Sequence, residues 1–135
     1  MSSVVGFSYE KENEMPKTIM IVDDAVSIRG LASMTLENAG YQVVEAHDGR
    51  DGLDKISQQR IHMVITDINM PHMDGIQLIK ALKAHSEYKF IPIVILTKET
   101  EPDKKKQGQK AGAKAWITKP FKPKTILGVV QKIIG

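Results

Sequence analysis

Short runs of apolar and β-branched residues recur along the chain and alternate with segments in which apolar residues have helical spacing. Such runs are typical of β-strands, and uninterrupted apolar runs such as MVIT and VILT are typical of strands buried on both faces of a parallel sheet. The predicted strands are Thr18–Val22, Gln42–Ala46, Met63–Thr66, Ile93–Thr97 and Ala115–Thr118.

Five segments between and after these strands are predicted to be helices, because their apolar residues recur three and four positions apart. The first places Ile28, Leu31, Ala32, Thr35, Leu36 and Ala39 on one inward face, and Gly40 ends it. The second runs from about Gly49 to Gln59. The last three are marked by Ile76, Ile79 and Leu82, by Pro102 and Gly112, and by Pro123 with Ile126, Val129, Val130 and Ile133 inward.

The alternation of five strands with five helices predicts an α/β domain whose parallel sheet is covered on both faces. The length of 135 residues fits a single domain, which we assign to residues 17–135. Residues 1–16 lack clear periodicity and are predicted to form a mobile N-terminal tail, with Met15 as an alternative start. Ligands of open parallel sheets bind at the carboxyl ends of the strands, so the polar residues there are the first candidates for function.

Chemically active side chains follow four of the five predicted strands. They are Asp23 and Asp24 after the first strand, Asp67 and Asn69 after the third, Thr97 at the end of the fourth and Lys119 after the fifth. Clustered carboxylates repel one another unless a cation lies among them, and carboxylate and carbonyl oxygens are the ligands that suit Mg²⁺. A carboxylate beside a metal ion and a lysine is also suited to attack phosphorus and become an acyl phosphate.

The alternative interpretation is that these residues only cap the helices that follow them, as Asp24 would cap the first helix. Their recurrence at successive strand ends favours one shared site.

The segments IMIVDDAVSIRG, VITDINMPHMDGIQLIKAL, IPIVILTKE and GAKAWITKPF resemble the receiver domain of two-component response regulators, most closely the stand-alone chemotaxis regulators. The resemblance covers about residues 17–134. It implies the flavodoxin-like (CheY-like) (βα)5 fold, a doubly wound five-stranded parallel sheet with strand order 2-1-3-4-5.

The resemblance also implies a role for each candidate residue. Asp67 matches the phosphoacceptor, and Thr97 and Lys119 match the hydroxyl and the lysine that assist phosphoryl transfer. The implied Mg²⁺ ligands are Asp23, Asp24, Asp67 and the backbone carbonyl of Asn69, with Asp24 the more direct ligand and Asp23 acting through water. The side chains of Asn69 and Glu99 match positions that tune dephosphorylation. The bond between Lys119 and Pro120 matches a cis peptide.

Two positions depart from the commonest pattern of the family. Lys98 follows Thr97 where a small residue is usual, and it either crowds the site or attracts anionic phosphodonors. Trp116 occupies the aromatic switch position, where Tyr or Phe is usual. We expect Trp116 to switch with Thr97 on phosphorylation, the alternative being a fixed aromatic residue.

The charge distribution is asymmetric. Residues 98–124 carry nine Lys against three Asp or Glu, whereas residues 1–97 have a net charge of −4. The resemblance assigns partner binding to the surface formed by the fourth helix (from about Pro102 to Gly112), the fifth strand (Ala115–Thr118) and the fifth helix (after Pro123), which coincides with this basic stretch. The predicted partner surface comprises Lys104, Lys105, Lys106, Lys110, Lys114, Trp116, Lys122 and Lys124, and we expect it to bind an acidic partner. The alternative is a solvated lysine face.

The resulting prediction is a phosphoacceptor signalling protein, not an enzyme in the ordinary sense, that assists its own phosphorylation and dephosphorylation. We expect a chemotaxis-type (CheA-like) histidine kinase as phosphodonor, a flagellar motor switch protein (FliM-like) as output partner, and a phosphatase as a further partner. We also expect a cytoplasmic monomer, and, because no linker follows Gly135, no DNA-binding output domain. A phosphorelay shuttle or phosphate sink with the same fold is the alternative.

Two other classes fit poorly. A phosphatase of the haloacid dehalogenase kind has its nucleophile after the first strand and carries a cap, for which 135 residues leave no room. A nucleic-acid binder would need a recognisable reading motif beside the lysines.

The absence of cysteine excludes disulfides and thiol chemistry, and no apolar stretch is long enough to span a membrane. The histidines His47, His62, His72 and His85 do not cluster in the sequence, and we assign them no metal.

Overall fold

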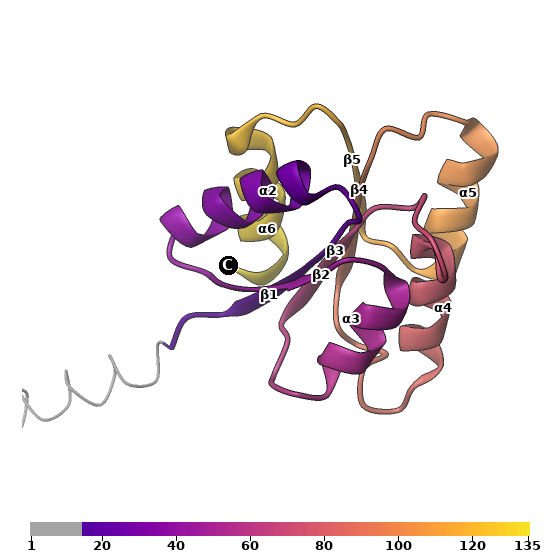
Figure 1. Ribbon diagram of the computed structural model, residues 1–135, viewed down its shortest axis with the longest axis horizontal. Coiled ribbons are helices and arrows are strands. Elements are labelled where there is room, and N and C mark those ends of the chain that lie inside the picture. Colours follow the sequence, from indigo (N-terminus) through magenta and orange to yellow (C-terminus); the bar gives the residue numbers. More distant parts are fainter. Residues whose placement is uncertain (1–14) are drawn as a thin grey trace, which may run out of the picture.

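The computed structural model describes residues 15–135. The predicted tail, residues 1–16, therefore lies mostly outside the described residues, whereas the alternative start, Met15, is the first residue described. The described part forms one parallel sheet between two layers of helices (Figure 1). Within this part, no helix is long and apolar enough to cross a membrane.

All five predicted strands are confirmed at their predicted boundaries. They are β1 (Thr18–Val22), β2 (Gln42–Ala46), β3 (Met63–Thr66), β4 (Ile93–Thr97) and β5 (Ala115–Thr118). Every neighbouring pair is parallel, and the order is β2-β1-β3-β4-β5, as the family resemblance implied. The strands β1, β3 and β4 are buried along their whole length, because helices cover both faces of the sheet.

The helices, labelled as in Figure 1, follow the strands one by one. They are α2 (Val26–Asn38), α3 (Gly49–Ile56), α4 (Gly75–Ala84), α5 (Pro102–Ala111) and α6 (Pro123–Ile134). Helices α2 and α6 cover one face of the sheet, and α3, α4 and α5 cover the other (Figure 1). Each face holds its own apolar core, with residues such as Leu36 and Ile126 on the first and Ile79 and Leu82 on the second.

Two details of the helix prediction are wrong. Helix α3 ends at Ile56 and not near Gln59, because Ile56 is its last residue with a buried side chain and Ser57 already serves as the C-cap. In α2, Leu31 is 51% exposed, and Ala39 is the exposed C-cap. The buried residues of α2 are Ala32, Ser33 and Leu36, so the inward face is narrower than the apolar spacing indicated.

Backbone hydrogen bonds continue beyond the strands and fix the residues that follow them. Asp23 N–H donates to Ala46 O, and Asp67 N–H donates to Val22 O, each at 3.0 Å. Lys119 N–H donates to Thr97 O at 2.9 Å. The candidate side chains are therefore anchored to the carboxyl edge of the sheet and do not lie on free loops.

Candidate functional site

Four of the predicted residues are buried polar groups at the carboxyl edge of the sheet. The exposed fraction is 2% for Asp23, 9% for Asp67, 1% for Thr97 and 8% for Lys119. Buried charges are costly unless they are paired, so this edge must supply partners for them.

Lys119 joins the two buried carboxylates. Its Nζ donates to Asp23 Oδ2 at 2.6 Å and to Asp67 Oδ2 at 2.8 Å. Burial alone would lower the pKa of Lys119, but the hydrogen bonds and the negative charges of Asp23 and Asp67 outweigh it and raise that pKa above its ordinary value. The ammonium is therefore charged at neutral pH. The bond that follows, between Lys119 and Pro120, is cis, as the resemblance implied.

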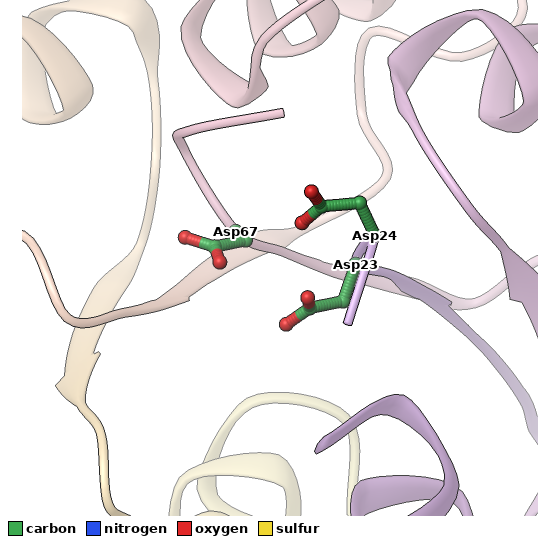
Figure 2. Close-up of side chains that lie close together, drawn as sticks. All are labelled: Asp23, Asp24 and Asp67. Carbon is green, nitrogen blue, oxygen red and sulfur yellow. The ribbon is translucent and has the colours of Figure 1, made fainter. Parts of the chain in front are cut away.

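The third carboxylate, Asp24, is exposed and completes the acidic cluster. Oxygen atoms of Asp23, Asp24 and Asp67 lie within 4.8 Å of one another. Figure 2 shows the three carboxylates projecting toward the same side of the site. The capping alternative for Asp24 is wrong, because the N-cap of α2 is Ala25 and no side chain caps that helix. It is Asp23 Oδ1 that accepts a hydrogen bond from Ala25 N–H, at 2.9 Å.

The donor set of this cluster fits a hard divalent cation. Carboxylate and carbonyl oxygens at one edge are the ligands of Mg²⁺, and no imidazole or thiol lies among them. The backbone carbonyl of Asn69 accepts no hydrogen bond from the rest of the described chain, so it is free to serve as a ligand. Asp67 Oδ1 also belongs to the cluster, and it already accepts one hydrogen bond, from Ile68 N–H at 2.6 Å.

A cavity of about 270 Å³ opens onto the cluster. Its lining includes Asp24, Asp67, Asn69, Thr97, Lys98 and Lys119. Because the side chain of Lys98 is exposed, this lysine stands at the wall of the cavity and does not fill it. The cavity therefore has room for a small anionic group between the acidic cluster and the basic side chains.

The two residues predicted to tune dephosphorylation contact each other beside this cavity. Asn69 Nδ2 donates to Glu99 Oε1 at 3.3 Å. Hydrogen bonds from the backbone of Glu101 and the side chain of Asn69 hold the pKa of Glu99 below its ordinary value, so Glu99 is ionised at neutral pH. Thr97 Oγ1 accepts from Glu99 N–H at 3.1 Å, which ties the predicted switch hydroxyl to the same loop.

Trp116 lies on β5 and packs against the core on the α4–α5 side. Its indole Nε1 is buried without a hydrogen-bond partner, and Lys105 Nζ lies 5.7 Å from the ring centroid. Gly108 of α5 faces this region, where a Cβ would lie 3.5 Å from Trp116 Cζ3. Most buried indole N–H groups have a hydrogen-bond partner. Because that of Trp116 has none among the described residues, hydrogen bonding does not fix the orientation of the ring.

The lysines of the predicted partner surface surround α5, β5 and the start of α6. They are Lys104, Lys105, Lys106, Lys110, Lys114, Lys122 and Lys124, and all except the half-buried Lys104 are exposed. None of them forms a salt bridge with a carboxylate of the described residues.

One further cluster at the same edge was not predicted from the sequence. His47 and His72, which are far apart in the sequence, both contact the buried Asp48 after β2, at 3.3 Å and 2.9 Å. The other two histidines are separate, since His62 accepts from Thr18 N–H and His85 stacks on Tyr88. The signal was the polar pair that follows β2, the one strand whose end was not considered.

Comparison with known proteins agrees with this geometry. The family of response regulator receiver domains matches the chain over residues 19–131. The chemotaxis protein CheY4 of Vibrio cholerae is 44% identical and superposes with a TM-score of 0.84 over 88% of this chain and 99% of CheY4. Protein PilG of Pseudomonas aeruginosa is 33% identical over 84% of this chain and 84% of PilG.

Several longer relatives share only this domain. The phosphate regulon transcriptional regulatory protein PhoB of Pseudomonas aeruginosa is 36% identical over 87% of this chain but only 52% of PhoB. The chain thus spans about half the length of such curated relatives. The family model matches nearly the whole chain, and the chain has the acidic cluster, the lysine that bridges two of its carboxylates, and the expected sheet order. We conclude that the chain belongs to the response regulator receiver domain family, whose members are signalling phosphoacceptors served by histidine kinases.

Proposed function

We propose that the chain accepts a phosphoryl group on Asp67 from a histidine kinase, in the presence of Mg²⁺, and thereby changes the surface formed by α5, β5 and α6. The observation that carries this proposal is the buried Lys119, which bridges Asp23 and Asp67 below a cavity open to solvent. A structural ion pair would not need a third, exposed carboxylate and an adjacent cavity.

In the proposed reaction, a carboxylate oxygen of Asp67 attacks the phosphorus of a phosphohistidine. A P–O bond forms to Asp67 as the P–N bond to the histidine breaks, which gives an acyl phosphate and returns the imidazole. The ammonium of Lys119 stabilises the phosphoryl oxygens, and the hydroxyl of Thr97 donates to one of them. Mg²⁺, when bound, supplies further positive charge to these oxygens. The residues that would hold it are Asp23, Asp24, Asp67 and the carbonyl of Asn69.

Dephosphorylation is a separate hydrolysis, in which water attacks the phosphorus, the P–O bond to Asp67 breaks, and inorganic phosphate leaves as the carboxylate is restored. The Asn69 amide and the ionised Glu99 lie beside the cavity, and we propose that they orient the attacking water. The chain would thus assist both reactions at its own residue without turning over a separate substrate.

The proposed switch links Asp67 to the partner surface through Thr97 and Trp116. A phosphoryl group that draws the Thr97 hydroxyl inward would break its hydrogen bond with Glu99 N–H, which lies in the loop that leads into α5. The indole of Trp116 has no hydrogen bond to lose when it moves. The phosphorylated chain would then present a different α5–β5–α6 surface.

We further propose that the output partner is acidic and that the pathway is chemotaxis, with a CheA-like kinase and a FliM-like motor switch protein in the cytoplasm. The likeness to a chemotaxis protein over nearly the full length of both chains supports the pathway. The lysines around Trp116, which form no salt bridge with a carboxylate of the described residues, support an acidic partner. A cavity of about 250 Å³, lined by Lys105, Gln109, Lys114 and Trp116, would receive an apolar side chain of that partner.

The test is a binding titration with the N-terminal segment of the flagellar switch protein. The chain is measured with Mg²⁺ alone and with Mg²⁺ plus beryllofluoride, which mimics a phosphoryl group on Asp67. Tighter binding only with the mimic supports a motor-directed regulator. No binding in either state, with the mimic shown to occupy Asp67, favours a phosphorelay shuttle or a phosphate sink.

A pair of charge reversals tests the partner surface itself. Lys105→Glu with Lys114→Glu should weaken the mimic-dependent binding, because both lysines line the cavity beside Trp116. Arg60→Glu with Lys89→Glu changes the net charge equally at exposed positions on loops at the other end of the sheet. Equal effects of the two double variants would contradict a defined surface and favour general electrostatic attraction.

A further inference from the structure

The turn between β2 and α3 is built around a buried carboxylate. Asp48 is 2% exposed and is the N-cap of α3, where its Oδ1 accepts from Asp51 N–H at 2.8 Å. Its Oδ2 lies 2.9 Å from His72 Nδ1 and 3.3 Å from His47 Nδ1. The hydrogen bond from the Asp51 backbone and that from His72 hold the pKa of Asp48 below its ordinary value. Asp48 is therefore a charged acceptor at neutral pH.

His72 reaches this carboxylate from another part of the chain, the loop between β3 and α4. That loop begins at Asp67, carries Asn69 and ends at Asp74, the N-cap of α4. His72 adopts a positive φ of 66°, the only positive φ of a non-glycine residue in the described chain. A left-handed backbone costs free energy for a residue with a Cβ, so the structure around His72 must stabilise it.

A second contact lies directly beside the first. Gly49 N–H donates to Met73 O at 3.1 Å. The backbones approach so closely that a Cβ on Gly49 would lie 2.6 Å from Met73 Cγ and 2.7 Å from Met73 O. The turn and the loop are thus joined at two consecutive residues on each side, Asp48 and Gly49 against His72 and Met73.

This junction fixes the loop on the side of the β2–α3 turn. On the other side, Ile68 and Asn69 are held by Asp67 Oδ1 and by Glu99. The carbonyl of Asn69, a proposed metal ligand, lies between these two sets of restraints. Segments without regular structure keep one conformation only where such contacts restrain them, and a preorganised ligand binds a metal ion more tightly.

We infer that the hydrogen bond between His72 and Asp48 is a latch that holds the β3–α4 loop in the conformation that presents Asn69 to the acidic cluster. His72 is therefore a positioning residue for the metal and phosphorylation site and does not touch the reacting atoms. This inference rests on the proposed function in so far as it concerns Mg²⁺. The hydrogen bond between His72 and Asp48, and its effect on the loop, do not depend on that function.

The experiment compares three variants with the unchanged chain. His72→Ala removes the latch. His72→Asn keeps a side-chain donor at the same distance along the side chain, and Asn tolerates a left-handed backbone. His47→Ala is the matched control, because His47 contacts the same carboxylate but lies on the turn itself and does not reach the loop. Both positions, His47 and His72, carry exposed side chains, so all three variants should fold.

Two readouts separate positioning from general stability. Hydrogen exchange is measured without metal at the hydrogen-bonded amides of the junction and the loop, Gly49, Met73 and Gly75, and the Kd for Mg²⁺ is measured by calorimetry. Loss of a hydrogen bond to a charged group predicts at least about tenfold faster exchange for His72→Ala, and the positioning role predicts a Kd weaker by a similar factor. His72→Asn and His47→Ala should stay within about twofold of the unchanged chain. The urea midpoint of all four proteins is measured as well, because loss of the hydrogen bond in His72→Ala also lowers the free energy of unfolding, and the amides of the central strands show how much of the faster exchange is global.

The outcomes distinguish the latch from the proposed function. Unchanged exchange in His72→Ala, or equal changes in His72→Ala and His47→Ala, overturns the latch whatever the metal does. Faster exchange with an unchanged Mg²⁺ Kd overturns the positioning role. If the unchanged chain does not bind Mg²⁺, the proposed function fails, and the metal-free exchange still decides whether the latch exists.

Discussion

Replacing Lys119 by Met should destabilise the protein and make its stability depend strongly on Mg²⁺. The methionine side chain fills nearly the same space but leaves Asp23 and Asp67 without the ammonium that now lies 2.6 Å and 2.8 Å from their oxygens. Two carboxylates and the nearby Asp24 would then face one another with no positive charge among them.

The magnitude follows from the burial of the pair. At an effective dielectric constant of about 20, two unit charges 4 Å apart interact by about 4 kcal/mol, and removing one partner of a buried pair costs about 3–5 kcal/mol. The cluster opens onto a solvent-filled cavity, so we expect the lower end, about 3 kcal/mol. For a domain of this length that corresponds to a decrease in Tm of about 10 °C.

The assay is urea unfolding at neutral pH, with a chelator and with saturating Mg²⁺. A divalent cation would take the place of the ammonium, so Mg²⁺ should restore most of the stability of Lys119→Met and should stabilise the unchanged chain less. Lys98→Met is the control, because Lys98 lines the same cavity but is exposed and pairs with no carboxylate of the described chain, and it should change stability by less than about 0.5 kcal/mol. Equal midpoints for Lys119→Met and the unchanged chain without metal would refute the reasoning.

Three further predictions concern residues that position the loops and helices around the site, Gly75, Gly108 and Asp48. Gly75→Ala would place a Cβ 2.0 Å from Asp67 O, so it should lower the free energy of unfolding by at least about 1–3 kcal/mol and slow phosphorylation, and normal rates would contradict this account. Gly108→Ala would bring a Cβ 2.6 Å from Ile95 Cδ1 beside Trp116, so it should cost about 1 kcal/mol and change the tryptophan fluorescence, whereas an unchanged spectrum would argue against this packing. The lowered pKa of Asp48 favours folding above its ordinary value of 3.8, and this contribution is lost as the pH falls through the folded-state pKa. Asp48→Asn should therefore be less stable than the unchanged chain at pH 6, with the gap in urea midpoint narrowing as the pH falls below 3.8, and a constant gap would contradict the assignment.

The strands were predictable because each central one is a short β-branched run that the sheet buries completely. That the residues at the carboxyl ends of the strands lie near one another was also predictable, because a parallel arrangement brings these ends to one edge of the sheet. Asp67 and Lys119 are 52 residues apart in the chain, yet the edge rule alone predicted that they lie close together, and the structure places them in contact.

The remaining features depend on packing that one sequence does not display. Spacing placed Leu31 on the inward face of α2, but adjacent positions of a helix lie 100° apart, and α6 and the sheet bury only the side that carries Ala32 and Leu36. The position of Asp48 directly after β2 marks it as a residue of the carboxyl edge, but its pairing with His72 joins two loops, and no pattern in the sequence indicates that partner. The sequence predicted that the carboxylates cluster and that Lys119 lies near them. It did not predict that the ammonium of Lys119 bridges Asp23 and Asp67.

The central claim is that Asp67 accepts a phosphoryl group with the help of the edge cluster. The most direct measurement is the intact mass of the chain after incubation with Mg²⁺ and acetyl phosphate, a small-molecule phosphodonor, followed by peptide mapping. The account predicts the addition of one phosphoryl group that maps to Asp67, requires Mg²⁺ and disappears in Asp67→Asn. A phosphoryl group that persists in Asp67→Asn, or no addition to a folded chain that binds Mg²⁺, would contradict it.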